Sequence, residues 1–140
     1  MKTEVWLTVT GEQRDRDGRR DRNEGRHRAL YEYADGTHIF EYREEDPESG
    51  AVTKSRMVIS QDLWTITRSG ALRTVMEFEP GREKNCIYDT AFGSIPMTVL
   101  AGRMGMRRNG DRFLARVTYS LSFGEGDPMD CAVTVKAEPV

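Results

Sequence analysis

Apolar and polar residues alternate with a period of two in short segments along most of the chain. The clearest of these segments are EVWLTVT (4–10), HIFEYREE (38–45), DLWTITRSG (62–70), VMEFE (75–79), ARVTYSLSF (115–123) and CAVTVK (131–136). Such alternation is typical of β-strands that bury one face. No window shows the apolar stripe of an amphipathic helix. The pattern therefore predicts an all-β protein.

Turn-forming residues separate the alternating segments. Asp35-Gly36 and Asn109-Gly110 are the pairs that suit two-residue hairpins, because both central residues can adopt positive φ. Ser49-Gly50, Ser69-Gly70 and Pro80-Gly81 mark further reversals. Short strands joined by tight turns predict an antiparallel meander, and a long meander curls to hide its edges. We expect an antiparallel up-and-down barrel of eight to ten strands, with a sandwich as the alternative.

One connection is long and highly charged. Residues 11–28, GEQRDRDGRRDRNEGRHR, contain seven arginines and five acidic residues. This composition offers little apolar surface to offset the entropy of ordering it. We therefore interpret residues 11–26 as a charged flexible loop. The interleaved acids cancel most of its positive field and it has no aromatic side chain for base stacking, so nucleic acid is not an expected partner.

Composition adds limits rather than a function. The chain has 140 residues, of which 37% are hydrophobic and 31% charged, with a formal net charge of −2. These values fit a single domain spanning residues 1–140 with no global attraction to nucleic acid or acidic membranes. No apolar run approaches the ~20 residues of a membrane-spanning helix, and the N-terminus lacks the apolar core of a secretion signal. We expect a cytoplasmic protein with no membrane partner.

Few residues suggest reactive chemistry. His27 and His38 are the only histidines, and neither stands at a metal-ligand spacing from a carboxylate. Cys86 and Cys131 lie far apart, without a CxxC or zinc spacing, and are expected to be free thiols. There is no phosphate-binding loop, nucleophile elbow or dinucleotide motif. The sequence favours a protein that is not an enzyme and predicts no catalytic residue, cofactor or metal.

Arg68 is the one charged residue that breaks the alternation. In DLWTITRSG, Trp64 and Ile66 form the apolar face, and Arg68 continues on the same side. If this face lines the interior, the guanidinium points inward near a strand end and needs an anion. Glu44, which shares a face with Tyr42, is a candidate partner. The alternative is that the strand ends early and Arg68 turns into solvent.

Four segments in order resemble the YwiB-like family of bacterial domains of unknown function. They are ITRSG, MEFEPG, YDTAFGSIPM and VTYSLSF, and the likeness runs from about Tyr31 to the last strand. The most specific elements are Arg68-x-Gly70 and the series Tyr88, Thr90, Phe92 and Gly93. The resemblance implies a bacterial protein with a calycin-like barrel, the architecture of lipocalins and fatty-acid-binding proteins. It implies no activity, and the arginine-rich connection departs from the family pattern.

The stretch YDTAFG (88–93) has two interpretations. As a turn, it would use Gly93 for positive φ and Asp89 and Thr90 to bond neighbouring backbone N–H groups, while Phe92 plugs the end of the barrel. As a binding lip, it would place Tyr88 and Thr90 at the rim, where they touch a guest.

Two functions from different classes remain. In the first, the barrel binds a small, partly apolar or anionic molecule in its interior, with Arg68, Tyr42, Glu44, Tyr88 and Thr90 as ligand-binding residues. In the second, the barrel is filled by its own side chains and acts as an interaction or structural protein through its rim or the arginine-rich segment. The size of the interior distinguishes the two.

Overall fold

The computed structural model describes all residues from 1 to 140 and contains ten β-strands and no helix. The strands are β1 (Thr3–Arg14), β2 (Arg20–Ala34), β3 (Thr37–Glu45), β4 (Val52–Ile59), β5 (Trp64–Gly70), β6 (Thr74–Phe78), β7 (Glu83–Thr90), β8 (Gly93–Asn109), β9 (Arg112–Phe123) and β10 (Met129–Pro139). It follows that no helix is long and apolar enough to cross a membrane.

All ten strands belong to one antiparallel sheet with the order β6-β5-β4-β3-β2-β1-β10-β9-β8-β7. Every strand pairs with its neighbour in the chain except β6 and β7, and β1 pairs with β10. The outer strands meet at a short seam, where Arg73 and Asp89 exchange backbone hydrogen bonds of 2.9 and 2.8 Å. The predicted antiparallel barrel is therefore confirmed, and it is nearly closed.

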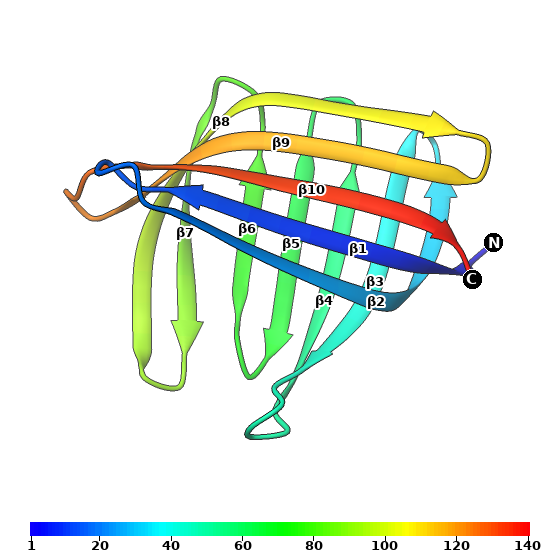
Figure 1. The fold of residues 1–140 in the computed structure, drawn as a ribbon, viewed down its shortest axis with the longest axis horizontal. Helices are drawn as coiled ribbons and strands as arrows, with labels where there is room; N and C mark the ends of the chain where they lie inside the picture. The colour runs from blue at the N-terminus through cyan, green and yellow to red at the C-terminus, as the bar shows by residue number, and fades with distance from the viewer.

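The barrel consists of two layers whose strands cross at a steep angle (Figure 1). Strands β1, β9 and β10 run along one layer, and β3 to β7 run across it in the other. The long strands β2 and β8 bend from one layer into the other. In β8 the bend accompanies a register shift between Ala101 and Met104, the kind of irregularity that turns a corner in a barrel.

The alternating residues form the core as the sequence predicts. Leu7, Phe40, Met57, Trp64 and Val117 are completely buried, and each occupies an inward position of its strand. One end of the interior is filled by a cluster of aromatic rings, including Phe40 and Phe113, which are tilted to one another with 5.5 Å between centroids. Beside them, a 2.8 Å hydrogen bond joins Nδ1 of His38 and the hydroxyl of Tyr31.

The prediction of a long loop at residues 11–26 is wrong, because most of this segment lies in paired strands. β1 continues to Arg14, β2 begins at Arg20, and the two pair without a break from Gln13 opposite Asp21 to Thr3 opposite Tyr31. Only Asp15–Arg19 form the turn, where the Asp15 carboxylate accepts the N–H groups of Asp17 and Arg19 at 3.0 and 2.8 Å. Strand pairing satisfies backbone groups whatever the side chains are, so a charged segment can extend a hairpin beyond the apolar core.

The stretch YDTAFG forms the hairpin turn between β7 and β8. Gly93 has a φ of 134°, as predicted for the reversal. The Thr90 hydroxyl accepts the N–H of Phe92 at 3.2 Å and donates to the carbonyl of Gly93 at 3.0 Å. Asp89 instead accepts the hydroxyl of Ser94 at 2.9 Å. Phe92 is fully exposed, so the prediction that it plugs the barrel is wrong, because the tight turn points its ring into solvent.

Candidate functional site: the barrel interior

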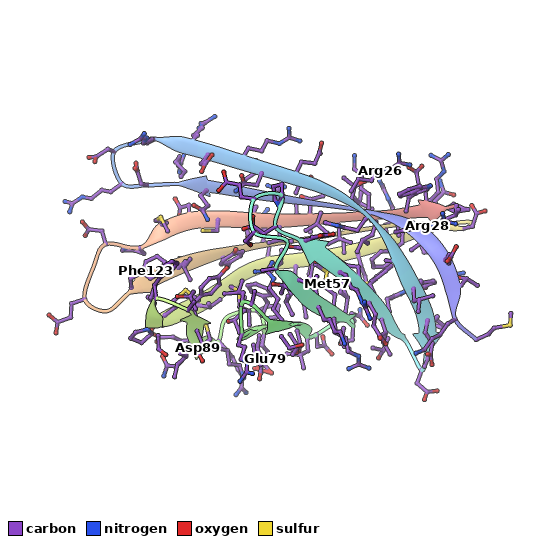
Figure 2. All side chains as sticks on the ribbon, turned by 90° about the horizontal axis from the view of Figure 1, so that it is seen from below. Arg26, Arg28, Met57, Glu79, Asp89 and Phe123 are labelled. Carbon is purple, nitrogen blue, oxygen red and sulfur yellow. The ribbon has the colours of Figure 1, made fainter.

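A cavity of about 590 Å³ occupies the part of the interior that the aromatic cluster leaves open. It is lined by 20 residues, 12 of them hydrophobic, a mixture typical of sites for small molecules. The apolar wall comes from both layers of the barrel and includes Met57, Ile66, Met76, Phe78, Met97, Leu121 and Val133. Figure 2 shows Met57 between the two layers.

Arg68 lies in the wall of this cavity on β5. The strand continues to Gly70, so Arg68 keeps the inward orientation of Trp64 and Ile66 that the alternation predicts. Its Nε atom is buried and has no hydrogen-bond partner in the protein. The predicted ion pair with Glu44 is absent, because the Glu44 carboxylate lies 4.0 Å from His27 Nε2 instead.

Register places three hydroxyl groups in line with Arg68 across four neighbouring strands. Tyr42 on β3 is opposite Ser55 on β4, Ser55 is opposite Arg68, and Arg68 is opposite Thr74 on β6. We call these four residues the polar row. Tyr42, Ser55 and Thr74 are 4%, 3% and 4% exposed, and none of their hydroxyl oxygens makes a hydrogen bond of standard geometry, although the Tyr42 hydroxyl lies close enough to Ser55 and Arg68 for both to lower its pKa.

The polar row lies directly beside an apolar row. The adjacent inward positions of the same four strands are Phe40, Met57, Ile66 and Met76, again paired in register. Met57, Ile66 and Met76 of the apolar row and Arg68 of the polar row line the cavity, so its wall changes from apolar to polar at Arg68. Buried polar atoms without partners carry a large free-energy cost, and the buried Nε atom of Arg68 in the cavity wall points to a polar guest.

The electrostatics of the site centre on Arg68. Burial raises the pKa of Tyr42, and the neighbouring Arg68 guanidinium opposes that rise. Burial also raises the pKa of Tyr119, which lines the cavity, and Arg68 again acts in the opposite direction. Next to Tyr119, burial raises the pKa of the Cys131 thiol to about 11. All three groups are therefore uncharged at neutral pH, and the charged side chains of the cavity wall near them are Arg68 and Glu44.

The cavity borders the place where β2 and β3 separate, since His27 on β2 and Glu44 on β3 line it. The two strands pair only between Leu30–Ala34 and Thr37–Glu41, and beyond that point they diverge. His27 on β2 and Glu44 on β3 face each other across the gap, and the His27 ring stacks on Tyr42 with centroids 4.7 Å apart. His27 also lines the cavity together with Gly25 and Asn23.

Four of the five residues predicted to bind a ligand come together. Arg68, Glu44 and Tyr88 line the cavity, and Tyr42 lies in the polar row beside Arg68. Thr90 does not reach the cavity, since its hydroxyl is bound within the β7–β8 turn.

Sequence reasoning missed Ser55 and Thr74, whose only signal is a hydroxyl residue at an inward position. It also missed His27 as part of the wall. No group of three His, Cys, Asp or Glu side chains is arranged to hold a metal ion.

The fold and the interior define a calycin-like β-barrel of ten antiparallel strands. Residues 7–135 match the model of the family described as Domain of unknown function (DUF1934), and the chain belongs to this family. It is similar in fold to the crystal structure of the ywiB protein from Bacillus subtilis, with a TM-score of 0.76 and 20% sequence identity over 98% of this chain and 93% of that chain. No curated protein matches the sequence. The YwiB-like resemblance is thus confirmed.

Proposed function

We propose that the barrel binds a small amphipathic anion, such as a carboxylate with an apolar body, in its interior. The observation that carries the proposal is Arg68, which lines the cavity beside an apolar wall and whose buried Nε atom has no hydrogen-bond partner of standard geometry. A carboxylate or phosphate group can accept hydrogen bonds from a guanidinium, and charge-assisted bonds of this kind are among the strongest in proteins. The apolar body of the ligand would lie against Met57, Ile66 and Met76.

The alternative, a barrel filled by its own side chains, has less support. The aromatic cluster fills one end, but a volume of about 590 Å³ remains beside Arg68, and known ligand pockets start at roughly 300 Å³. A filled barrel would also have to bury Arg68 with an internal anion, and the nearest candidate, Glu44, is directed at His27.

A matched pair of fluorescent probes tests the proposal. Anilinonaphthalene sulfonate carries an anionic group on an aromatic body, and phenylnaphthylamine is a similar molecule without the sulfonate. We expect the wild-type protein to bind the sulfonate more tightly than the neutral probe. Arg68→Gln should weaken sulfonate binding by about tenfold or more, the effect of losing a charge-assisted hydrogen bond, and leave the neutral probe unchanged.

The control variant is Arg56→Gln on β4. Arg56 is half-exposed on the outer face, where its Nε lies 3.9 Å from the carboxylate of Glu41. Its replacement should change the binding of neither probe. Equal weakening by the two substitutions, or no difference between the two probes, would contradict an anion site at Arg68. Native mass spectrometry of protein purified from its own host would then identify any retained molecule.

A further inference from the structure

One edge of β2 is unpaired over residues 20–29. Its other edge pairs with β1 along this whole length, but β3 pairs only with Leu30–Ala34. No backbone hydrogen bond outside the strand ladders involves residues 20–29. A strand edge of this length with free N–H and C=O groups is a template for pairing with another strand.

The turns at the two ends of β2 determine which backbone groups face the free edge. At the β2–β3 hairpin, Asp35 and Gly36 have φ values of 50° and 76°, as in a type I′ turn, so Ala34 and Thr37 exchange hydrogen bonds and Ala34 faces β3. The backbone N–H and C=O groups of consecutive residues point to opposite edges of a strand. Those of the even-numbered residues of β2 therefore point to the free edge. At the other hairpin, the N–H of Asp15 donates to the carbonyl of Arg19 at 3.0 Å. The N–H and C=O groups of the odd-numbered residues of β2 therefore point to β1, which agrees with this assignment.

The even-numbered residues along the free edge are strongly basic. They are Arg20, Arg22, Glu24, Arg26 and Arg28, and all five are exposed. Their side chains lie on the outer face of the barrel, where the guanidinium of Arg26 lies 4.3 Å from the centroid of the Trp6 ring. Figure 2 shows Arg26 and Arg28 on the outside. The free edge thus combines five donor–acceptor pairs with four arginines at alternate positions.

We propose that this edge binds an extended acidic segment of another protein by strand addition. An antiparallel strand that pairs with Arg20–Arg28 places its side chains directly opposite those of β2, about 5 Å away, so acidic residues at alternate positions meet the arginines. Its other side chains point inward at the gap between β2 and β3, near His27 and Glu44. The present partners of the arginines do not prevent this. Arg26 and Arg28 form exposed ion pairs with Glu138 and Glu4, at 3.6 and 2.8 Å, and such pairs are individually weak.

A second copy of this chain is a poor occupant of the edge. Two β2 strands that pair antiparallel with the greatest overlap place Arg22 opposite Arg26 and Arg20 opposite Arg28. Like charges directly opposite one another destabilise a strand pair. The charge pattern therefore selects an acidic partner and opposes self-association.

The first experiment uses the wild-type protein and synthetic peptides. The probe is a short fluorescent peptide that alternates glutamate with valine and has threonine in place of the central glutamate. We expect it to bind more tightly than a scrambled peptide of the same composition. N-methylation of the glutamates should abolish binding because their N–H groups face β2, whereas N-methylation of the valines should have little effect because theirs face away.

The second experiment changes the edge without changing its arginines. Glu24→Pro removes one free N–H that β1 does not use, and prolines are tolerated on edge strands. We expect it to weaken peptide binding by about tenfold relative to Glu24→Ala, which loses the same carboxylate but keeps the N–H. If Glu24→Pro does not fold, the N-methylated peptides still decide the question with the wild-type protein.

Other results would overturn the proposal. Equal effects of the two N-methylation patterns would mean that the peptide binds by charge alone. Binding of the scrambled peptide with the same affinity would mean the same. If sedimentation shows a dimer that Glu24→Pro dissociates and Glu24→Ala does not, the edge pairs with a second copy of the chain instead of an acidic partner.

Discussion

Gly70 shows how a single residue fixes the end of the strand that carries Arg68. Its φ is 117°, a conformation that side chains other than glycine rarely adopt. A Cβ atom added there would lie 2.5 Å from the carbonyl oxygen of Val52 on the neighbouring strand. The Arg68-x-Gly70 element therefore has two separate physical roles, because the arginine lines the cavity and the glycine allows the close approach that ends β5.

Replacing Gly70 by alanine should destabilise the fold. The positive φ and the contact with Val52 together should lower the free energy of unfolding by about 1–3 kcal/mol, the range for strained backbone positions. Gly105→Ala is the control, since a Cβ at Gly105 has no atom within 4 Å and its φ is not positive. Urea denaturation of both variants measures the difference. A Gly70→Ala protein as stable as Gly105→Ala would mean that the turn relaxes without cost.

At the scale of elements, the hairpin of β1 and β2 is where reasoning from the sequence failed. Strands were recognised through apolar alternation, and residues 11–26 have none because their outward positions are charged and Gln13, Asn23 and Gly25 occupy inward ones. The pairing is nevertheless regular, with Arg116 and Thr134 continuing the polar surface onto β9 and β10 through a 2.8 Å hydrogen bond. Charged residues in this segment alternate with small polar ones, so its period of two is carried by polar side chains instead of apolar ones.

The turn of this hairpin depends on one carboxylate. Asp15 accepts two backbone N–H groups, whereas the Asp17 side chain accepts none. We expect Asp15→Ala to speed amide hydrogen exchange at Gln13 and Asp21, the residues next to the turn that bond across the hairpin, because the loss of a local hydrogen bond costs about 1 kcal/mol. Asp17→Ala should leave their exchange as in the wild type. Nuclear magnetic resonance gives the rates residue by residue, and equal effects of the two substitutions would show that Asp15 does not hold the turn.

At the scale of the whole molecule, the sequence was sufficient for the barrel but not for the row of polar groups inside it. Period-two alternation fixes which face of each strand is buried, so the inward positions of Tyr42 and Arg68 follow from the sequence. The line from Tyr42 through Ser55 and Arg68 to Thr74 depends on the register between strands, which the turn geometry sets. Because that register was not predicted, Glu44 appeared to be the natural partner of Arg68, although it lies one step further along β3.

The stability of the whole barrel tests whether Arg68 serves the fold or a ligand. With no internal anion beside it, the guanidinium is a cost to the empty protein, so Arg68→Met should leave the free energy of unfolding unchanged or raise it by about 1 kcal/mol. Arg56→Met removes an exposed ion pair from the outer face and should change the stability by less than about 0.5 kcal/mol. Urea denaturation without added ligand compares the three proteins. A loss of about 3 kcal/mol or more in Arg68→Met would mean that the arginine has an internal partner and that its role is structural. Unchanged or increased stability, together with the loss of sulfonate binding, would mean that the arginine serves ligand binding and does not stabilise the empty barrel.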